Sequence, residues 1–107
     1  FGTGFAIAAM KGSEANDPMT YAGDTVRTTR NHNGGITGGI TNGMPVLFRV
    51  AIKPTPSISR PQQTVDLATG KDTVLEIKGR HDPCIVPRAV PVIEAVTAWI
   101  LLDMMIH

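Results

Sequence analysis

The chain is short of cysteine, aromatic residues and net charge. Its 107 residues include one cysteine, Cys84, so no internal disulfide can form and a reducing compartment is expected. Aromatic residues make up 5% and the formal net charge is +1, which favours neither nucleic-acid stacking nor attraction to an anionic membrane. The histidines show no metal-ligand spacing. We therefore expect one small cytoplasmic domain with no nucleic-acid partner, no membrane and no metal.

Apolar residues make up 42% of the chain, which is enough for a modest core. The first residue is Phe1, and no basic stretch precedes it, so the start does not resemble a signal or transit peptide. The apolar, glycine-broken stretch 1–10 is expected to form a strand. A chain that starts inside a predicted strand suggests a segment of a longer protein.

Alternating apolar and polar residues predict strands in the second half of the chain. The clearest strand is expected at 45–53, where every second residue is apolar and one face is uniform. A shorter strand is expected at 64–67, followed by a turn at 68–72 and another clear strand at 73–78. Residues 11–33 are rich in loop-forming residues and predict a long loop.

The stretch 87–106 predicts one long helix, with two prolines near its start, where N–H groups lack intrahelical partners. From residue 92 onward the only polar residues before the last position are Glu94, Thr97 and Asp103. A helix that is apolar on nearly every side is expected to be buried, in a core or between subunits. A membrane span is the alternative, which Glu94 and Asp103 would make costly.

Residues 31–43 are dense in glycine. Successive glycines let a backbone approach a ligand closely, and their N–H groups can point into one concavity that suits a phosphate or the polar edge of a flavin. Neither the Rossmann spacing nor a P-loop is present. A flexible or tightly turned connection explains the stretch equally well when it is taken alone.

Lys53 ends the clearest predicted strand and leads into Pro54-Thr55-Pro56-Ser57. The prolines fix φ, so little ordering entropy is lost when a ligand binds there. Lys53 supplies a cation, and Thr55 and Ser57 supply hydroxyl groups. The alternative is a solvated lysine at the exit of an edge strand.

A guanidinium, an imidazole and a carboxylate stand together in Arg80-His81-Asp82, just before the predicted helix. Arg80 can hold a phosphate or a flavin carbonyl with its planar fork of donors. Asp82, if dehydrated by a flavin, suits proton exchange. The alternatives are an Arg–Asp ion pair, or Asp82 as a turn or helix cap. Cys84 is expected to be a small, buried apolar residue, and nothing supports a nucleophilic role.

Taken in order, three motifs resemble the C-terminal part of chorismate synthases. They are Asn31-His32-Asn33 with the paired glycines that follow, Lys-Pro-Thr-x-Ser at 53–57, and Arg-His-Asp-Pro-Cys at 80–84 with Ala-Val-Pro-Val-Ile-Glu four residues later. The resemblance covers essentially all of 1–107 and corresponds to about the last third of a family member. It implies an α+β fold, with antiparallel strands packed on helices in a layered β-α-β sandwich, assembled as a homotetramer.

The resemblance also implies a lyase reaction, in which 5-enolpyruvylshikimate 3-phosphate becomes chorismate and phosphate by 1,4-elimination with reduced FMN. Asp82 is then the catalytic, proton-handling residue near flavin N5, and His81 orients its neighbours. Arg27 and Arg30 are the candidates for holding the phosphorylated substrate. The residues implied in FMN binding are Gly38, Lys53, Pro54, Thr55, Pro56, Ser57 and Arg80.

Two other functions stay open at this point. The chain alone is expected to be inactive, because the family's two important histidines lie in the N-terminal part. It would then be a phosphate- or flavin-binding module without catalysis, or a structural domain that interacts through its apolar helix. Flavin titration with and without substrate turnover separates these possibilities.

Overall fold

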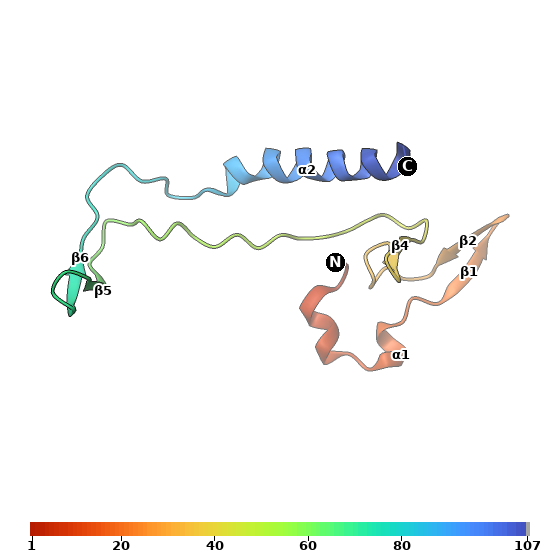
Figure 1. The fold of residues 1–107 in the computed structure, drawn as a ribbon. Coiled ribbons are helices and arrows are strands. Elements are labelled where there is room, and N and C mark those ends of the chain that lie inside the picture. Colours follow the sequence, from red (N-terminus) through yellow and green to blue (C-terminus); the bar gives the residue numbers. More distant parts are fainter. Residues whose placement is uncertain (107) are drawn as a thin grey trace. The chain divides into compact units, whose positions relative to one another are not determined.

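The computed structural model describes residues 1–106 as an α+β arrangement of short antiparallel hairpins and helices (Figure 1). It divides into two units, the first from Phe1 to Ala51 and the second from Ile52 onward. The first unit contains a 3-10 helix η1 (Gly4–Ala9), a short helix α1 (Gly12–Ala15) and the strands β1 (Met19–Ala22), β2 (Thr25–Thr28), β3 (Ile36–Thr37) and β4 (Ile40–Thr41). The second unit contains β5 (Gln62–Asp66), β6 (Lys71–Leu75) and the long helix α2 (Val86–Ile106).

Each sheet is a single antiparallel hairpin of consecutive strands. In the first hairpin Met19 lies opposite Thr28, and the turn contains Gly23 at a φ of 64°. In the second, Thr37 lies opposite Ile40 across a two-residue turn. The third pairs β5 with β6, with Gln62 opposite Leu75. Strand pairing is therefore local throughout the described residues, because each strand pairs with its neighbour in sequence.

The first unit is held together by a close backbone crossing that needs glycine. The N–H of Gly2 donates to the carbonyl of Leu47 at 2.8 Å, and the N–H of Leu47 donates to the carbonyl of Gly34 at 3.0 Å. A Cβ on Gly34 would overlap the backbone nitrogen of Gly2 and lie 2.5 Å from the Leu47 oxygen. Three segments that are distant in sequence can meet here only because Gly2 and Gly34 carry no side chain.

Asp17 fixes the start of the glycine-rich stretch. Its two carboxylate oxygens accept hydrogen bonds from the backbone N–H groups of His32 and Asn33, each at 2.8 Å. Thr3 Oγ1 and His32 Nδ1 lie 2.7 Å apart and share another hydrogen bond. The conformation of this stretch is thus set by side chains that come from two other segments of the unit.

Three of the expected elements are wrong. Residues 1–10 form η1 rather than a strand, because Gly2 and Gly4 adopt φ values of 51° and 62° and turn the chain. The expected loop at 11–33 contains α1 and the first hairpin, since Gly23 supplies a turn between two short strands rich in threonine. No strand forms at 45–53, because alternation makes a strand only where another strand pairs with it.

The remaining expectations are confirmed within a few residues. The strand expected at 64–67 is β5, the turn closes with the Gly70 N–H donating to the Asp66 carbonyl at 2.8 Å, and the strand expected at 73–78 is β6. The helix expected at 87–106 is α2. Pro91 lies inside this helix, so one backbone carbonyl of the first turns has no helical N–H partner.

Within residues 1–106 no apolar side chain is buried, and so the expected core does not form within this chain. Helix α2 was expected to be buried, yet none of its residues is, because nothing in the described chain covers it. Its burial in a core or between subunits, like the layered sandwich, stays a prediction. By length and composition α2 also qualifies as a membrane span, but a single helix of this kind is weak evidence for one.

Candidate functional site

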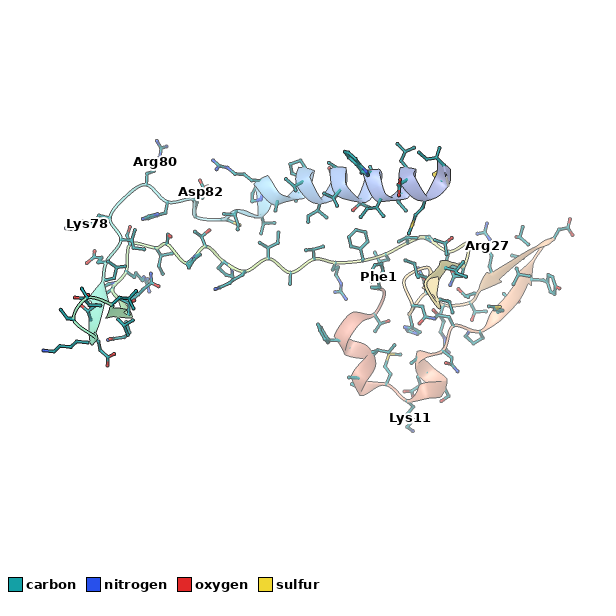
Figure 2. The ribbon with its side chains drawn as sticks, in the orientation of Figure 1. Phe1, Lys11, Arg27, Lys78, Arg80 and Asp82 are labelled. Atoms are coloured by element: carbon teal, nitrogen blue, oxygen red, sulfur yellow. The ribbon has the colours of Figure 1, made fainter. Side chains whose placement is uncertain are left out.

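Two segments of the second unit, 54–59 and 79–83, line one open hollow of about 390 Å³. Figure 2 shows Arg80 and Asp82 on the irregular segment that leads from β6 to α2. This volume lies within the range of small-molecule sites. The hollow therefore brings together two motifs that are well separated in sequence. Its lining residues are Pro54, Thr55, Ile58, Ser59, Gly79, His81, Asp82 and Pro83.

Local contacts hold both walls of this hollow. The side-chain amide of Gln62 donates to the carbonyl of Pro56 at 3.0 Å, which ties the proline-rich wall to the start of β5. On the other wall, His81 Nε2 lies 3.3 Å from the carbonyl of Ile77 and donates to it. His81 thus bonds within its own segment, and the orienting role that the resemblance implies for it stays a prediction.

The hydroxyl of Thr55 is buried and has no hydrogen-bond partner among residues 1–106. A buried polar group without a partner costs free energy. Thr55 lines the hollow, so its hydroxyl is a candidate for pairing with a group bound there, although the side-chain oxygen of Asn31 in the first unit is likewise buried and unpaired. The hollow also carries the carboxylate of Asp82. One hydroxyl and one carboxylate on a largely rigid wall fit the polar edge of a flavin ring, and they fit the implied FMN.

Asp82 forms an ion pair, with 2.9 Å between its Oδ2 and Arg88 Nη1. The sequence left an Arg–Asp ion pair open as an alternative, without naming the arginine. The partner is Arg88, in the first turn of α2. Sequence reasoning missed Arg88, although its position at the start of the predicted helix, close behind Asp82, was the available signal.

Some of the residues of this unit that were expected to bind FMN line the hollow, and others do not. Pro54 and Thr55 line it together with Asp82. Pro56, Ser57 and Arg80 belong to the same two segments, and Lys53 directly precedes the first of them, but none of the four is among the lining residues. Cys84 is exposed, so the expectation of a buried cysteine is wrong. It follows Pro83 in the irregular segment, where no apolar cluster is available to enclose it.

The other expected site residues belong to the first unit. Gly38 and Gly39 form the turn between β3 and β4 with φ values of 60° and 83°, as a type I′ hairpin requires. A Cβ on Gly38 would meet nothing within 4 Å, so this glycine leaves open space. Arg27 is exposed on β2, whereas Arg30 Nη1 donates to the carbonyl of Glu14 at 2.9 Å. The tightly turned connection is confirmed, and a ligand role for Gly38, Arg27 or Arg30 stays a prediction.

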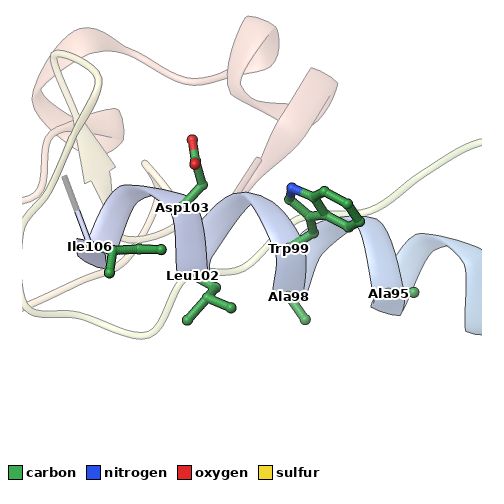
Figure 3. Close-up of a pocket in the computed structure, with 6 residues that line it drawn as sticks. All are labelled: Ala95, Ala98, Trp99, Leu102, Asp103 and Ile106. Carbon is green, nitrogen blue, oxygen red and sulfur yellow. The ribbon is translucent and has the colours of Figure 1, made fainter.

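A second hollow lies along helix α2 (Figure 3). All of its lining residues come from this one helix, so side chains flank an open face and no second wall encloses a ligand. Within residues 1–106 no cluster of three or more His, Cys, Asp or Glu side chains could hold a metal ion. The hollow at Thr55 and Asp82 is therefore the stronger candidate for a site with chemistry.

The family model and the curated relatives that match this chain carry the same description. A family model described as chorismate synthase matches residues 1–106. The chorismate synthase of Methanocella arvoryzae is 60% identical over 105 residues, which are 98% of this chain and 28% of that protein. The chorismate synthase of Opitutus terrae is 57% identical over 102 residues, 95% of this chain and 28% of that protein. The chain thus spans 28% of the length of these two relatives.

Proposed function

This chain belongs to the chorismate synthase family, and from that membership we propose that it forms one wall of the FMN site of a lyase. The lyase converts 5-enolpyruvylshikimate 3-phosphate to chorismate and phosphate by 1,4-elimination. The proposal goes beyond the comparisons, because the relatives are far longer than this chain.

One observation carries the proposal. The Lys-Pro-Thr-x-Ser motif and the Arg-His-Asp motif, which the sequence marked separately, share one hollow through Thr55 and Asp82. Thr55 adds a buried hydroxyl that needs a partner. A structural domain that acted only through its apolar helix would not need this convergence of two motifs, so the arrangement favours a ligand site.

Reduced FMN, when bound, supplies the electron-rich ring that the elimination of phosphate needs. The chain's own residues bind that ring and exclude water from it. Thr55 donates or accepts a hydrogen bond at the flavin edge, and the prolines on either side of it keep the wall rigid. Asp82 holds or moves a proton through its carboxylate at the rim of the hollow.

Cationic and glycine residues complete the proposed site. Lys53 and Arg80 flank the hollow in sequence and supply positive charge for the flavin phosphate or a flavin carbonyl. Gly38 provides open space for close approach of a backbone to the cofactor. Arg27 and Arg30 are proposed to bind the phosphorylated substrate. Of these two, Arg27 has the freer side chain, because Arg30 bonds a backbone carbonyl.

The assembled enzyme is proposed to be a cytoplasmic homotetramer with the layered β-α-β sandwich of its family. The uncovered helix α2 supports assembly with further protein. It exposes Trp99, Leu102 and Ile106 at 77%, 61% and 71%. Exposed apolar area of this extent on one helix is stable in water only when other parts of the protein cover it.

The test is a hybrid enzyme in which this chain replaces the 105 matched residues of the Methanocella arvoryzae relative. The proposal predicts that the hybrid binds FMN and converts the substrate, since the relative supplies the rest of the protein. The isolated chain is expected to give no turnover in the same assay. A folded hybrid that binds no flavin and forms no chorismate would contradict the proposal.

The same assay separates the alternatives. A flavin-binding module without catalysis would let the hybrid bind FMN and yet form no chorismate. A purely structural domain would give a hybrid whose flavin affinity and turnover are unchanged by Thr55→Val and Asp82→Asn.

A further inference from the structure

We propose that Arg88 is a positioning residue for Asp82, holding its carboxylate at the rim of the hollow. The inference rests on the proposed function, in which Asp82 handles a proton beside the flavin. Arg88 is not among the residues that line the hollow, so it acts through Asp82 rather than by touching a ligand.

The backbone around Asp82 does little to fix its side chain. Between Leu75 at the end of β6 and Val86 at the start of α2, the chain forms neither helix nor strand. Asp82 therefore has no ladder or helical hydrogen bonds that would limit its orientation. The contact of 2.9 Å between Arg88 Nη1 and Asp82 Oδ2 supplies that constraint.

Arg88 itself stands on a rigid support. It lies in the first turn of the 21-residue helix α2, and its N–H donates to the carbonyl of Ile85 at 3.1 Å. The N–H of Ala89 donates to the same carbonyl, also at 3.1 Å. Pro87 fixes φ immediately before Arg88. The guanidinium is thus projected from the fixed end of the longest element in the second unit.

The ion pair does not explain folding stability. The side chains of Arg88 and Asp82 are 78% and 42% exposed, and ion pairs as exposed as this contribute little to stability. The contact joins one guanidinium nitrogen to one carboxylate oxygen, Oδ2. The second oxygen, Oδ1, is left for a proton or a ligand atom.

A double-mutant cycle in the hybrid enzyme tests this role, with Arg88→Met and Asp82→Asn alone and combined. Arg88→Met is expected to lower kcat about tenfold and to leave KM for the substrate within about twofold, because only the orientation of Asp82 changes. Arg88→Lys keeps the charge and should recover kcat to within about threefold of the unmodified hybrid. In the Asp82→Asn background, Arg88→Met should add less than about a twofold loss.

The affinity for oxidised FMN, measured by flavin fluorescence, gives a second readout. Arg88→Met should leave the Kd within about twofold, because Arg88 does not line the hollow. Arg60→Met is the matched control, since Arg60 is exposed and is not a lining residue, and it should leave kcat within about twofold.

The outcomes separate the inference from the proposed function. An equal loss from Arg88→Met with and without Asp82→Asn would overturn the inference, and so would a loss of FMN affinity as large as the loss of kcat. An active hybrid that is indifferent to Arg88→Met would overturn the inference alone. A folded hybrid without turnover would overturn the proposed function and the inference with it.

Discussion

Glycines allow close backbone contacts in the first unit of the chain, whereas prolines and polar side chains line a hollow in the second. In the first unit, Gly2 and Gly34 are buried and permit a backbone crossing that any side chain would block. In the second unit, prolines and an irregular segment line a hollow, and the buried hydroxyl of Thr55 has no partner among the described residues. One buried side-chain oxygen of the first unit, Asn31 Oδ1, also has no partner among the described residues, so the two units differ in what their glycines and prolines do and not in the pairing of every polar group.

Glycine and buried polar groups have different physical explanations in the two units. A glycine whose missing Cβ is needed by neighbouring backbone atoms is explained by folding, and it needs no ligand. A buried hydroxyl without a partner is not explained by folding, because it costs stability until something binds it. Substitutions in the two units should therefore separate into losses of stability and losses of function.

The largest effect is expected from Gly34→Ala in the first unit. The added methyl group would overlap the backbone at Gly2, and its φ of 66° is unfavourable for alanine, so the unfolding free energy of the hybrid should fall by about 3 kcal/mol or more. Gly38→Ala is the matched control, because it shares the positive φ but meets no atom within 4 Å, and should cost about 1 kcal/mol. Thermal unfolding of both variants measures the difference. Equal losses of stability would show that the backbone contacts around Gly34 do not matter, because Gly38 has no such contacts.

Asp82→Asn, in the second unit, should lower activity and leave stability nearly unchanged. We expect a fall in kcat of about 100-fold or more, because the amide cannot accept the proton, with little change in unfolding temperature. Steady-state kinetics and thermal unfolding of the hybrid provide the two numbers. A variant that keeps kcat within about threefold of the unmodified hybrid would rule out a proton-handling role for Asp82.

Thr55→Val is expected to have a smaller effect, on binding. Removing the hydroxyl while keeping the shape of the side chain should weaken FMN binding about tenfold, as the loss of one buried hydrogen bond to the ligand does. Thr55→Ser keeps the hydroxyl and should bind within about threefold of the unmodified hybrid. Flavin fluorescence titration gives both Kd values. If Thr55→Val binds FMN as tightly as Thr55→Ser, the open hydroxyl does not meet the flavin.

The smallest effect concerns pH and the hairpin of β5 and β6. The N–H of Ala68, followed by the side chain and N–H of Thr69, lowers the pKa of Asp66 below its ordinary 3.8. A lowered pKa in the folded state stabilises the turn at pH values above 3.8, and this contribution is lost as the pH falls through the folded value. NMR titration of the Asp66 carboxyl should show its midpoint below 3.8, and Thr69→Ala should move the midpoint upward. A midpoint at or above 3.8 would show that the turn does not hold the carboxylate.

The sequence predicted the second half of the chain better than the first. Strands β5 and β6 and helix α2 follow from local alternation and from a long apolar run, both of which are properties of neighbouring residues. The strand expected at 45–53 has the right alternation but no pairing partner, and pairing is a long-range property. The crossing of Gly2 with Gly34 was equally invisible, since it depends on segments that are distant in sequence.

The site, like the fold, could be predicted only where it depends on residues that are neighbours in sequence. The motifs containing Thr55 and Asp82 were recognised from the order of their residues, but their common hollow needed coordinates. An Arg–Asp ion pair was one alternative, but the sequence did not identify Arg88 as the partner, because the choice between nearby arginines depends on how the irregular segment folds. The exposure of Cys84 was missed because burial depends on what surrounds a residue, and here little does.

The most direct measurement is a crystal structure of the hybrid enzyme with FMN bound. We expect a flavin ring against the wall formed by 54–59 and 79–83. A polar flavin atom should lie within hydrogen-bond distance of Thr55 Oγ1, and the carboxylate of Asp82 should face the ring. A flavin bound elsewhere, with the hydroxyl of Thr55 still buried and unpaired, would contradict it.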